Sequence, residues 1–568
     1  MATNFHLIGV GGSGAKSVAA FVHCCAAGLA PPSVTVSLLD QDASNGNVSE
    51  ASELISTYRS LYQRLGKNLP PSPERMTLFG SEIANPQNGT APETPRVWLP
   101  LGATVTTMGE HFQYPRLRPE IKHLVSALLN QHEEIGLQLD RGFRGRPAVG
   151  AVVLSSLGAS HPLLDYLDRI ANDAGHQQRV FLAGSVFGGM GASGLPTVAR
   201  TLRNLRSAPG RGGRRAAARN GSFNIGTALL LPYFEFPDPP SGTAAAEEIA
   251  VTSAQIPWSS RMALEYYHSQ IDGDGGSDIF DHLYLVGQQP LTSVDYFSTG
   301  SRDQRNPALL PEMLAALAGC HFFAAESIPS GKIFRASHRD SQIGWEDLPR
   351  VWSVANAHEV RIGMAQLLRF AFAYRYAYFP CIHGDRSART YGGFDWYAKL
   401  IGRRGLKGDD IDTAKELNRY CTLLLRWIAD IFYSYKKMST GGETALGLFD
   451  VSRFSVDPRV RTRTAAGTAA INDVALMGDH PRSAATRDRE PAAVKDEDVP
   501  GLAEAFTELV GDEGKGGALD LLYIYDALER SRPRASPGLT AFVDALWRAC
   551  ATIPAADAPK LPPWWQSA

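Results

Sequence analysis

The sequence has little of what marks metal-binding, secreted or nucleic-acid-binding proteins. The chain of 568 residues contains only six cysteines, and none has the C-x-x-C spacing of zinc sites and redox motifs. We therefore expect no metal centre and no disulfide framework, and a reducing, cytoplasmic location. The net charge is only −2, which disfavours a protein that binds nucleic acid through bulk electrostatics.

Long apolar runs are also scarce. The most apolar late segment, residues 362–379, carries Arg369 and Arg375, so it is predicted to be a buried helix rather than a membrane span. The N-terminal apolar run leads directly into glycines and has no basic region or cleavage site of a signal peptide. We expect neither a membrane partner nor a nucleic-acid partner.

Glycine, in contrast, is concentrated in segments where backbone N–H groups could form a binding site. Residues 179–200 read RVFLAGSVFGGMGASGLPTVAR, which predicts a buried strand over 180–183, a glycine-rich loop and then a helix. Glycines allow backbone N–H groups to converge on an anion, and a helix N-terminus adds partial positive charge. The pattern predicts a phosphate cradle; the alternative is a tight strand-to-helix turn that binds nothing.

A second glycine-rich loop follows the first predicted strand, residues 5–10. Gly9, Gly11 and Gly14 fit the G-x-G-x-x-G pattern of dinucleotide-binding proteins, between a strand and a helix that starts at Ala15. A P-loop is disfavoured because Ala15 separates Gly14 from Lys16.

Two further loops are predicted at strand ends. The strand 34–39 ends at Asp40, followed by Gln41 and Asp42, and a predicted strand at 148–154 leads into the small-residue loop 155–162. In a parallel sheet the carboxyl ends of the strands lie at one edge, so these loops would line one crevice. The sequence therefore predicts an α/β fold with a Rossmann-like parallel sheet.

The rest of the chain predicts further strands and then mostly helices. Strands are expected at 223–231 and 280–287, followed by a helix over 306–323 that is capped by Asn306 and Pro307. Helices are then expected near 355–378, 412–437, 501–511, 517–530 and 537–551. We predict a nucleotide-binding domain at 1–325, a helix-rich domain at 326–454, a linker or disordered segment at 455–500, and a helical segment at 501–568.

The order of these loops resembles that of the tubulin/FtsZ superfamily of GTPases, and most closely its divergent bacterial tubulin-like members. The family signature G-G-G-T-G-[ST]-G is replaced here by Gly188-Gly189-Met190-Gly191-Ala192-Ser193-Gly194. The other similar segments are Gly11-Gly12-Ser13-Gly14 for the first phosphate loop, Leu39-Asp40-Gln41-Asp42 for the second, Gly158-Ala159-Ser160-His161-Pro162 for the γ-phosphate loop, and Leu231-Pro232-Tyr233-Phe234-Glu235 for the ribose loop. Asn306 stands where that family has a guanine-contacting residue at the start of its central helix.

The resemblance implies a site for GTP or GDP with Mg²⁺, and head-to-tail self-assembly into filaments in the cytoplasm. Hydrolysis would be completed by acidic residues of the neighbouring subunit, for which Glu346 and Asp347 are the candidates; their alternative role is a solvated turn before Pro349. The helical C-terminal region would bind a partner protein. Met190 lacks the hydroxyl of the family's threonine, and Ser193 is the residue that could compensate.

Two other functions stay open on the sequence. A nucleotide-gated scaffold with little hydrolysis would explain Met190 and the weak acidic motif. An NAD(P)-dependent oxidoreductase would use Gly9, Gly11, Gly14 and Asp40, but it leaves the glycines of 184–194 without a role.

Overall fold

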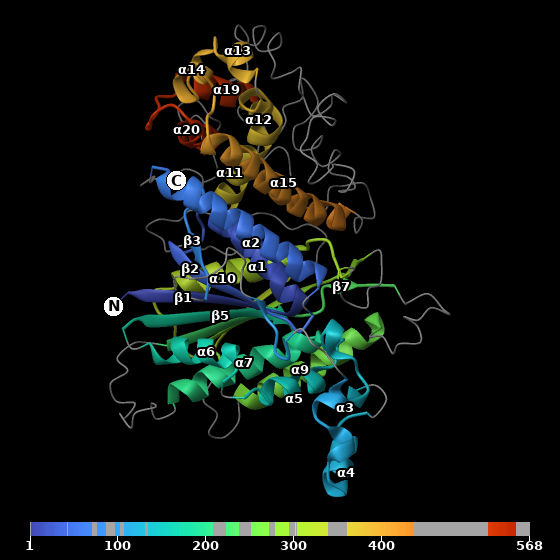
Figure 1. Ribbon diagram of the computed structural model, residues 1–568. Helices are drawn as coiled ribbons and strands as arrows, with labels where there is room; N and C mark the ends of the chain where they lie inside the picture. Colours follow the sequence, from blue (N-terminus) through green and yellow to red (C-terminus); the bar gives the residue numbers. More distant parts are fainter. Residues whose placement is uncertain are drawn as a thin grey trace. The chain divides into compact units, whose positions relative to one another are not determined.

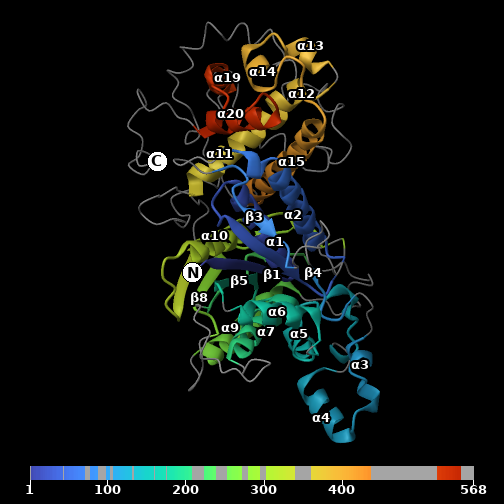
Figure 2. The same ribbon diagram turned by 60° about the vertical axis from the view of Figure 1, so that its left-hand side comes forward.

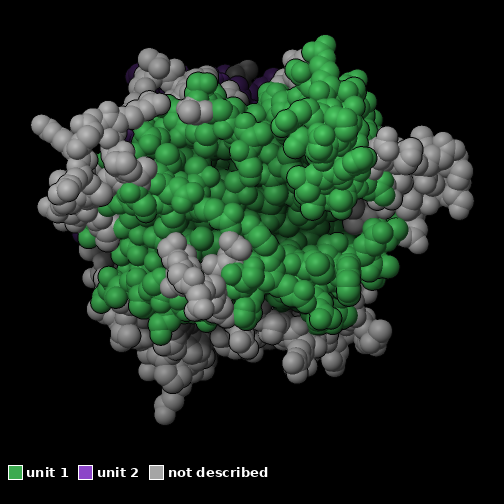
Figure 3. Space-filling model, turned by 90° about the horizontal axis from the view of Figure 1, so that it is seen from below, with its two compact units in different colours: residues 1–22, 31–56, 83–340 green, residues 23–30, 57–82, 341–568 purple. Residues whose placement is uncertain are grey.

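In the computed structural model the chain forms two compact units, which Figure 3 draws in different colours. Unit 1 comprises residues 1–22, 31–56 and 83–340, and unit 2 comprises residues 23–30, 57–82 and 341–568. The structure describes residues 2–42, 44–70, 77–86, 97–102, 107–130, 134–158, 160–173, 175–207, 223–237, 252–271, 279–294, 302, 304–338, 360–384, 386–436 and 521–551.

A parallel β-sheet forms the centre of unit 1. Its strands are β1 (Thr3–Val10), β2 (Ser33–Leu39), β3 (Glu82–Ala84), β4 (Val97–Trp98), β5 (Gln177–Ser185), β6 (Phe223–Leu230), β8 (His282–Gln288) and β10 (Lys332–His338). Their order is β10-β8-β6-β5-β1-β2-β3, and β4 also pairs with β2. β1 pairs in parallel with β2 and β5, and β5, β6, β8 and β10 continue the parallel series. The predicted parallel α/β sheet is confirmed, with the strand order changing direction between β1 and β5, as in doubly wound folds.

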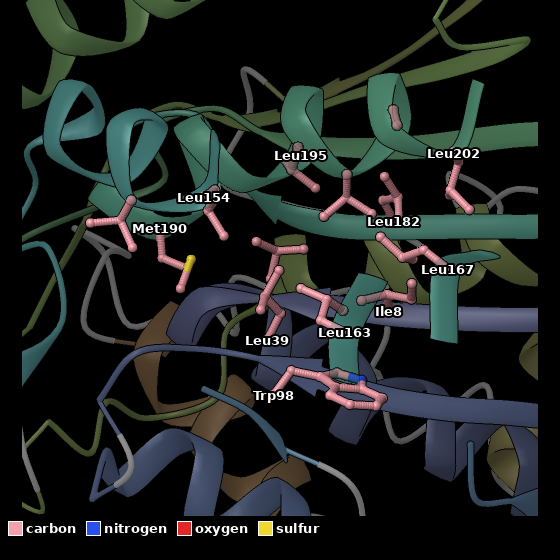
Figure 4. Close-up of a cluster of buried hydrophobic side chains, with 14 of the residues drawn as sticks. Ile8, Leu39, Trp98, Leu154, Leu163, Leu167, Leu182, Met190, Leu195 and Leu202 are labelled. Atoms are coloured by element: carbon pink, nitrogen blue, oxygen red, sulfur yellow. The ribbon is translucent and has the colours of Figure 1, made fainter. Parts of the chain in front are cut away.

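Helices cover both faces of this sheet (Figures 1 and 2). On one face lie α5 (Pro147–Ser155), α6 (Pro162–Asn172), α7 (Gly189–Ser207) and α9 (Ile256–Ile271), and on the other lie α1 (Gly11–Ala26) and α10 (Leu310–Ala324). Successive side chains of β5 point to opposite faces of the sheet. Phe181 packs against Phe322 of α10, whereas Leu182 belongs to the cluster around Leu195 and Leu202 of α7 (Figure 4). This alternation is the expected consequence of a strand buried on both sides.

Unit 1 contains further α-helices and strands besides these. They are α2 (Gly46–Arg64), which continues into unit 2, α3 (Met108–His111), α4 (Pro119–Leu128), β7 (Phe234–Glu235) and β9 (Thr292–Ser293). β7 and β9 pair in parallel as a separate two-stranded sheet.

Three sequence-based predictions in unit 1 are wrong. The helix expected to start at Ala15 begins at Gly11, so residues 11–14 form the first turn of α1 and no loop separates them from β1. Residues 148–154 form helix α5 and not a third core strand. Pro147 occupies the first turn of α5, where a missing N–H costs nothing, and the apolar run has no alternation that would distinguish a strand from a buried helix. The helix expected from Asn306 begins instead at Leu310, with Pro311 in its first turn. There Glu312 accepts a hydrogen bond from the backbone N–H of Leu309 at 2.8 Å.

Unit 2 is mainly helical in its described part. Its helices are α11 (Val360–Phe372), a π-helix (Ala373–Tyr378), α12 (Phe379–Ile382), α13 (Ser387–Tyr391), α14 (Asp395–Leu400), α15 (Asp409–Lys436), α19 (Leu521–Arg530) and α20 (Leu539–Ala551). The expected helix-rich C-terminal region is confirmed for these residues. The predicted linker at 455–500 and the helix near 501–511 lie outside the described residues.

No helix in the described ranges has an apolar stretch that could cross a membrane. Arg369 and Arg375, on the segment that the sequence marks as most apolar, are both buried within unit 2. All six cysteines are described, and they are buried and form no disulfide.

Candidate functional site

The first glycine-rich loop and the start of α7 lie side by side in unit 1. α1 begins at Gly11, directly after β1, and α7 begins at Gly189, shortly after β5. Because β1 and β5 are parallel neighbours, both helices start at the same edge of the sheet. A β-carbon placed on Gly11 would lie 3.5 Å from the backbone nitrogen of Gly191. The two glycine-rich segments therefore form one continuous surface.

Close packing of these helices against the strands requires glycine. A β-carbon on Gly14 would lie 2.4 Å from the carbonyl oxygen of Ala183, and one on Gly191 would lie 2.2 Å from that of Ser185. Both distances are far shorter than a carbon can approach an oxygen. The backbones of α1 and α7 are thus held against the sheet edge with their N-termini together. Since the N–H groups of a helix's first turn have no partner inside the helix, this arrangement attracts an anion.

A third helix N-terminus, that of α2, reaches the same place but is already capped. The side-chain oxygen of Asn45 accepts hydrogen bonds from the N–H groups of Asn47 and Val48. The N–H of Asn47 also lies 3.1 Å from the carbonyl oxygen of Gln304. A β-carbon on Gly12 would lie 3.2 Å from the side-chain amide nitrogen of Asn47. The start of α2 therefore borders the first glycine-rich segment. The hydrogen bonds of Asn45 and Asn47 at the start of α2 therefore go to Gln304 and Asn306 in the segment before α10.

Two buried carboxylates follow β2 at this edge. Asp40 accepts a hydrogen bond from the N–H of Asp42 at 3.0 Å, and Asp42 accepts hydrogen bonds from the N–H and hydroxyl groups of Ser44. Between them, Gln41 is buried and fixes the loop to Leu101 and Gly102. Burial raises the pKa of Asp40 to about 7, and the charge of Asp42 adds to the rise. A cation bound here would favour the ionised form of Asp40.

A buried ion pair links α1 to α10 beside the first loop. Lys16 lies 2.8 Å from a carboxylate oxygen of Glu312, which is fully buried, and also contacts the carbonyl oxygen of Pro307. Tyr233 donates a hydrogen bond to Glu312 at 2.9 Å, and its oxygen lies 3.3 Å from the Ser13 hydroxyl. Burial raises the pKa of Tyr233 well above its usual range, so it stays a donor. Lys16 therefore anchors the helices and does not extend along the glycine-rich loop.

Comparison with models of known protein families gives no match to this chain, and comparison with curated protein sequences gives none either.

In the segment 188–194, neither Met190 nor Ser193 offers a hydroxyl group to a ligand. Met190 is buried and belongs to the apolar cluster with Leu195 (Figure 4). The hydroxyl of Ser193 donates a hydrogen bond to the carbonyl oxygen of Gly189 at 2.7 Å, inside α7. The remaining members of this candidate set, Gly188, Gly189, Gly191, Ala192 and Gly194, lie just before or within the first turns of α7. Binding at this segment would therefore rely on backbone N–H groups.

The other site residues predicted from the sequence lie in several different places. Gly158 and Ser160 are exposed and follow helix α5 instead of a strand, and Ala159 lies outside the described residues. Glu235 is exposed on β7, two residues beyond the buried Tyr233. Asn306 lies in the segment before α10, where its N–H donates a hydrogen bond to the side-chain oxygen of Asn47 at 3.1 Å. Glu346 and Asp347 lie outside the described residues.

Sequence reasoning missed the partners of Lys16. Glu312 follows it by almost three hundred positions, and no local pattern joins the two. The one available signal was Glu312 itself, the third residue of a helix that is apolar apart from Glu312 and His321. A glutamate buried in such a helix needs a partner. Within the ranges given above, no three His, Cys, Asp or Glu side chains cluster in a way that could hold a metal ion without other ligands.

Proposed function

We propose that unit 1 is a GTP-binding unit of the tubulin/FtsZ type, and that the protein assembles head to tail with any hydrolysis completed by a neighbouring subunit. The observation that carries this proposal is the contact between the two glycine-rich segments, with Gly11 next to Gly191 at the edge where β1 and β5 end. Two helix N-termini that meet in this way suit a chain of several phosphates better than a single one.

The surrounding residues fit the other parts of such a ligand. Asp40 and Asp42 supply oxygens that Mg²⁺ bound to phosphates could use, and such an ion would neutralise phosphate charge. Asn306, whose backbone N–H is bonded to Asn47 of α2 and whose neighbour Gln304 is bonded to Asn45, is the residue that we propose contacts the base. Glu346 and Asp347 stay the candidates for the acidic groups offered to the next subunit.

The two alternative functions make different demands on this edge of the sheet. A Rossmann-type NAD(P) oxidoreductase needs only the first glycine-rich loop, and it gives the start of α7 no role. A scaffold that binds nucleotide but hardly hydrolyses it is favoured by the buried Met190 and by the internal hydrogen bond of Ser193. Phosphate release measured on assembled protein separates this scaffold from a GTPase.

Calorimetric titration with GTP, GDP and ATP tests the proposal, with Gly12→Asp as the variant. Gly12 lies in the first turn of α1, where a β-carbon would lie 3.2 Å from the side-chain amide nitrogen of Asn47. The Asn47 amide has to shift by a few tenths of an ångström to admit a carboxylate, which then repels phosphate. We expect wild-type protein to bind GTP and GDP in preference to ATP, and Gly12→Asp to weaken both by about tenfold or more.

The matched control is Gly393→Asp in unit 2, where a β-carbon meets nothing within 4 Å. It should leave both affinities unchanged. Wild-type protein that binds none of the three nucleotides would remove the proposal.

A further inference from the structure

The side chain of Asn47, in the first turn of α2, has its oxygen already used. Asn47 is only 3% exposed, and its Oδ1 accepts a hydrogen bond from the backbone N–H of Asn306 at 3.1 Å. Because a backbone N–H can only donate, this bond settles the orientation of the amide group. The oxygen of Asn47 faces Asn306, and the side-chain nitrogen, Nδ2, points away from it.

The Nδ2 group of Asn47 lies beside the first turn of α1 and has no acceptor. A β-carbon on Gly12 would lie 3.2 Å from this nitrogen. No described residue accepts a hydrogen bond from Nδ2. Nδ2 is also not among the fully enclosed polar atoms that lack a partner in the described part of the chain, so it keeps contact with solvent. A donor in so buried a residue is normally paired, and this one is available to a ligand.

The segment 302–306 holds the start of α2, and with it Asn47, in place. A β-carbon on Gly46 would lie 2.7 Å from the carbonyl oxygen of Arg302, so the two backbones are in close contact. Glu50, one turn further along α2, forms an ion pair with Arg305. These contacts fix the amide of Asn47 before any ligand binds, which lowers the entropy that a bond to the ligand would cost.

We propose that Nδ2 of Asn47 donates a hydrogen bond to a phosphate oxygen of the nucleotide bound at the start of α1. The first turn of α1 has α7 on one side, where Gly11 faces Gly191, and Asn47 on the other, where Gly12 faces Nδ2. The inference rests on the proposed function, since it needs a phosphate chain at this place. Because Oδ1 of the same side chain holds Asn306, Asn47 would join the phosphate-binding and base-binding parts of the site.

The test compares wild-type protein, Asn47→Ser and Asn47→Asp by calorimetric titration with GTP and with inorganic triphosphate, both in the presence of Mg²⁺. Serine removes the amide without adding charge. Aspartate keeps the oxygen that faces Asn306 but replaces Nδ2 with a charged oxygen. We expect Asn47→Ser to weaken both ligands about tenfold, because a hydrogen bond to a charged group is lost. Asn47→Asp should weaken both at least as much, since its carboxylate also repels phosphate. Either variant carries the test if the other fails to fold.

Asn4→Ser is the matched control, because it removes an amide at the other end of β1, where Asn4 donates a hydrogen bond to Asp173 at 3.1 Å. It should leave both affinities unchanged. Inorganic triphosphate has no base, so a loss of GTP affinity alone would show that Asn47 acts only through Asn306. That result, or unchanged affinity for both ligands, would overturn the inference, while GTP binding by wild-type protein would still support the proposed function. If wild-type protein binds neither ligand, both proposals fail.

Discussion

At the scale of single residues, the ion pair of Lys16 and Glu312 in unit 1 depends on several partners at once. A carboxylate that is fully buried is costly unless a cation and hydrogen-bond donors surround it. Glu312 has all of these, from Lys16, Tyr233 and the N–H of Leu309. These contacts join α1, the segment after β6 and the start of α10, so the pair fixes the elements around the first glycine-rich loop.

We predict that Lys16→Met lowers the free energy of unfolding of unit 1 by about 3–5 kcal/mol, because it leaves the Glu312 carboxylate buried without its cation. The double variant Lys16→Met/Glu312→Gln should recover much of this loss, since the amide oxygen of glutamine still accepts a hydrogen bond and carries no charge. The midpoint of urea denaturation, followed by fluorescence, measures both changes.

The control for this pair is Lys399→Met, which breaks an exposed i,i+4 pair with Asp395 at 3.3 Å and an exposed hydrogen bond to the carbonyl oxygen of Glu529 at 3.3 Å. Removal of such a surface pair should cost no more than about 0.5 kcal/mol. A loss from Lys16→Met as small as that from Lys399→Met would show that the buried pair does not stabilise unit 1.

At the scale of elements, the contact of α7 with β5 depends on one glycine. The β-carbon of an alanine at position 191 would lie 2.2 Å from the carbonyl oxygen of Ser185, so the start of α7 has to move away from the strand. We predict that Gly191→Ala destabilises unit 1 by about 2–3 kcal/mol and weakens nucleotide binding. Thermal denaturation and calorimetric titration measure the two effects.

Gly188→Ala provides the comparison within the same segment. Its β-carbon would meet only the side-chain hydroxyl of Ser185, at 2.9 Å, and a serine hydroxyl can rotate away. The substitution should cost less than about 1 kcal/mol. Equal destabilisation by Gly191→Ala and Gly188→Ala would contradict the role that the structure gives to Gly191.

Elements were predictable from the sequence where local chemistry marks both of their ends. β1, β2 and β5 are apolar runs that stop at Gly11, Asp40 and the glycines after Ser185, and all three were located. α5 was mistaken for a strand because a short helix that is apolar on most sides has no periodicity to reveal it. The start of α10 was misplaced because Pro307 and Pro311 both suit a first turn, and only the tertiary contacts of Glu312 decide between them.

The candidate site likewise has parts that the sequence predicts and parts that it does not. Its glycine-rich segments could be predicted because glycine at a strand-to-helix junction has a local cause. The residues that hold these segments in place, Lys16, Asn47, Tyr233 and Glu312, act across long separations in the sequence. A single sequence can show that a residue such as Glu312 needs a buried partner, but it does not show which distant residue that partner is.

At the scale of the whole molecule, the proposed function requires two subunits to complete one site. If Glu346 and Asp347 act on the nucleotide of the next subunit, two different variants, each inactive alone, should complement each other. Gly12→Asp subunits are expected to bind nucleotide at least about tenfold more weakly but retain both acidic residues. Subunits with Glu346→Gln and Asp347→Asn keep the glycine-rich segments and lack the acidic pair.

We predict that each variant alone releases phosphate from GTP at no more than about a tenth of the wild-type rate, and that an equimolar mixture recovers a substantial part of it. In a head-to-tail contact, an intact nucleotide site of one variant meets an intact acidic pair of the other. The rate per subunit of wild-type protein should also rise with protein concentration, because only assembled subunits have complete sites. A mixture no more active than the separate variants, with a wild-type rate per subunit that is independent of concentration, would place the hydrolytic groups within one chain and remove the need for assembly.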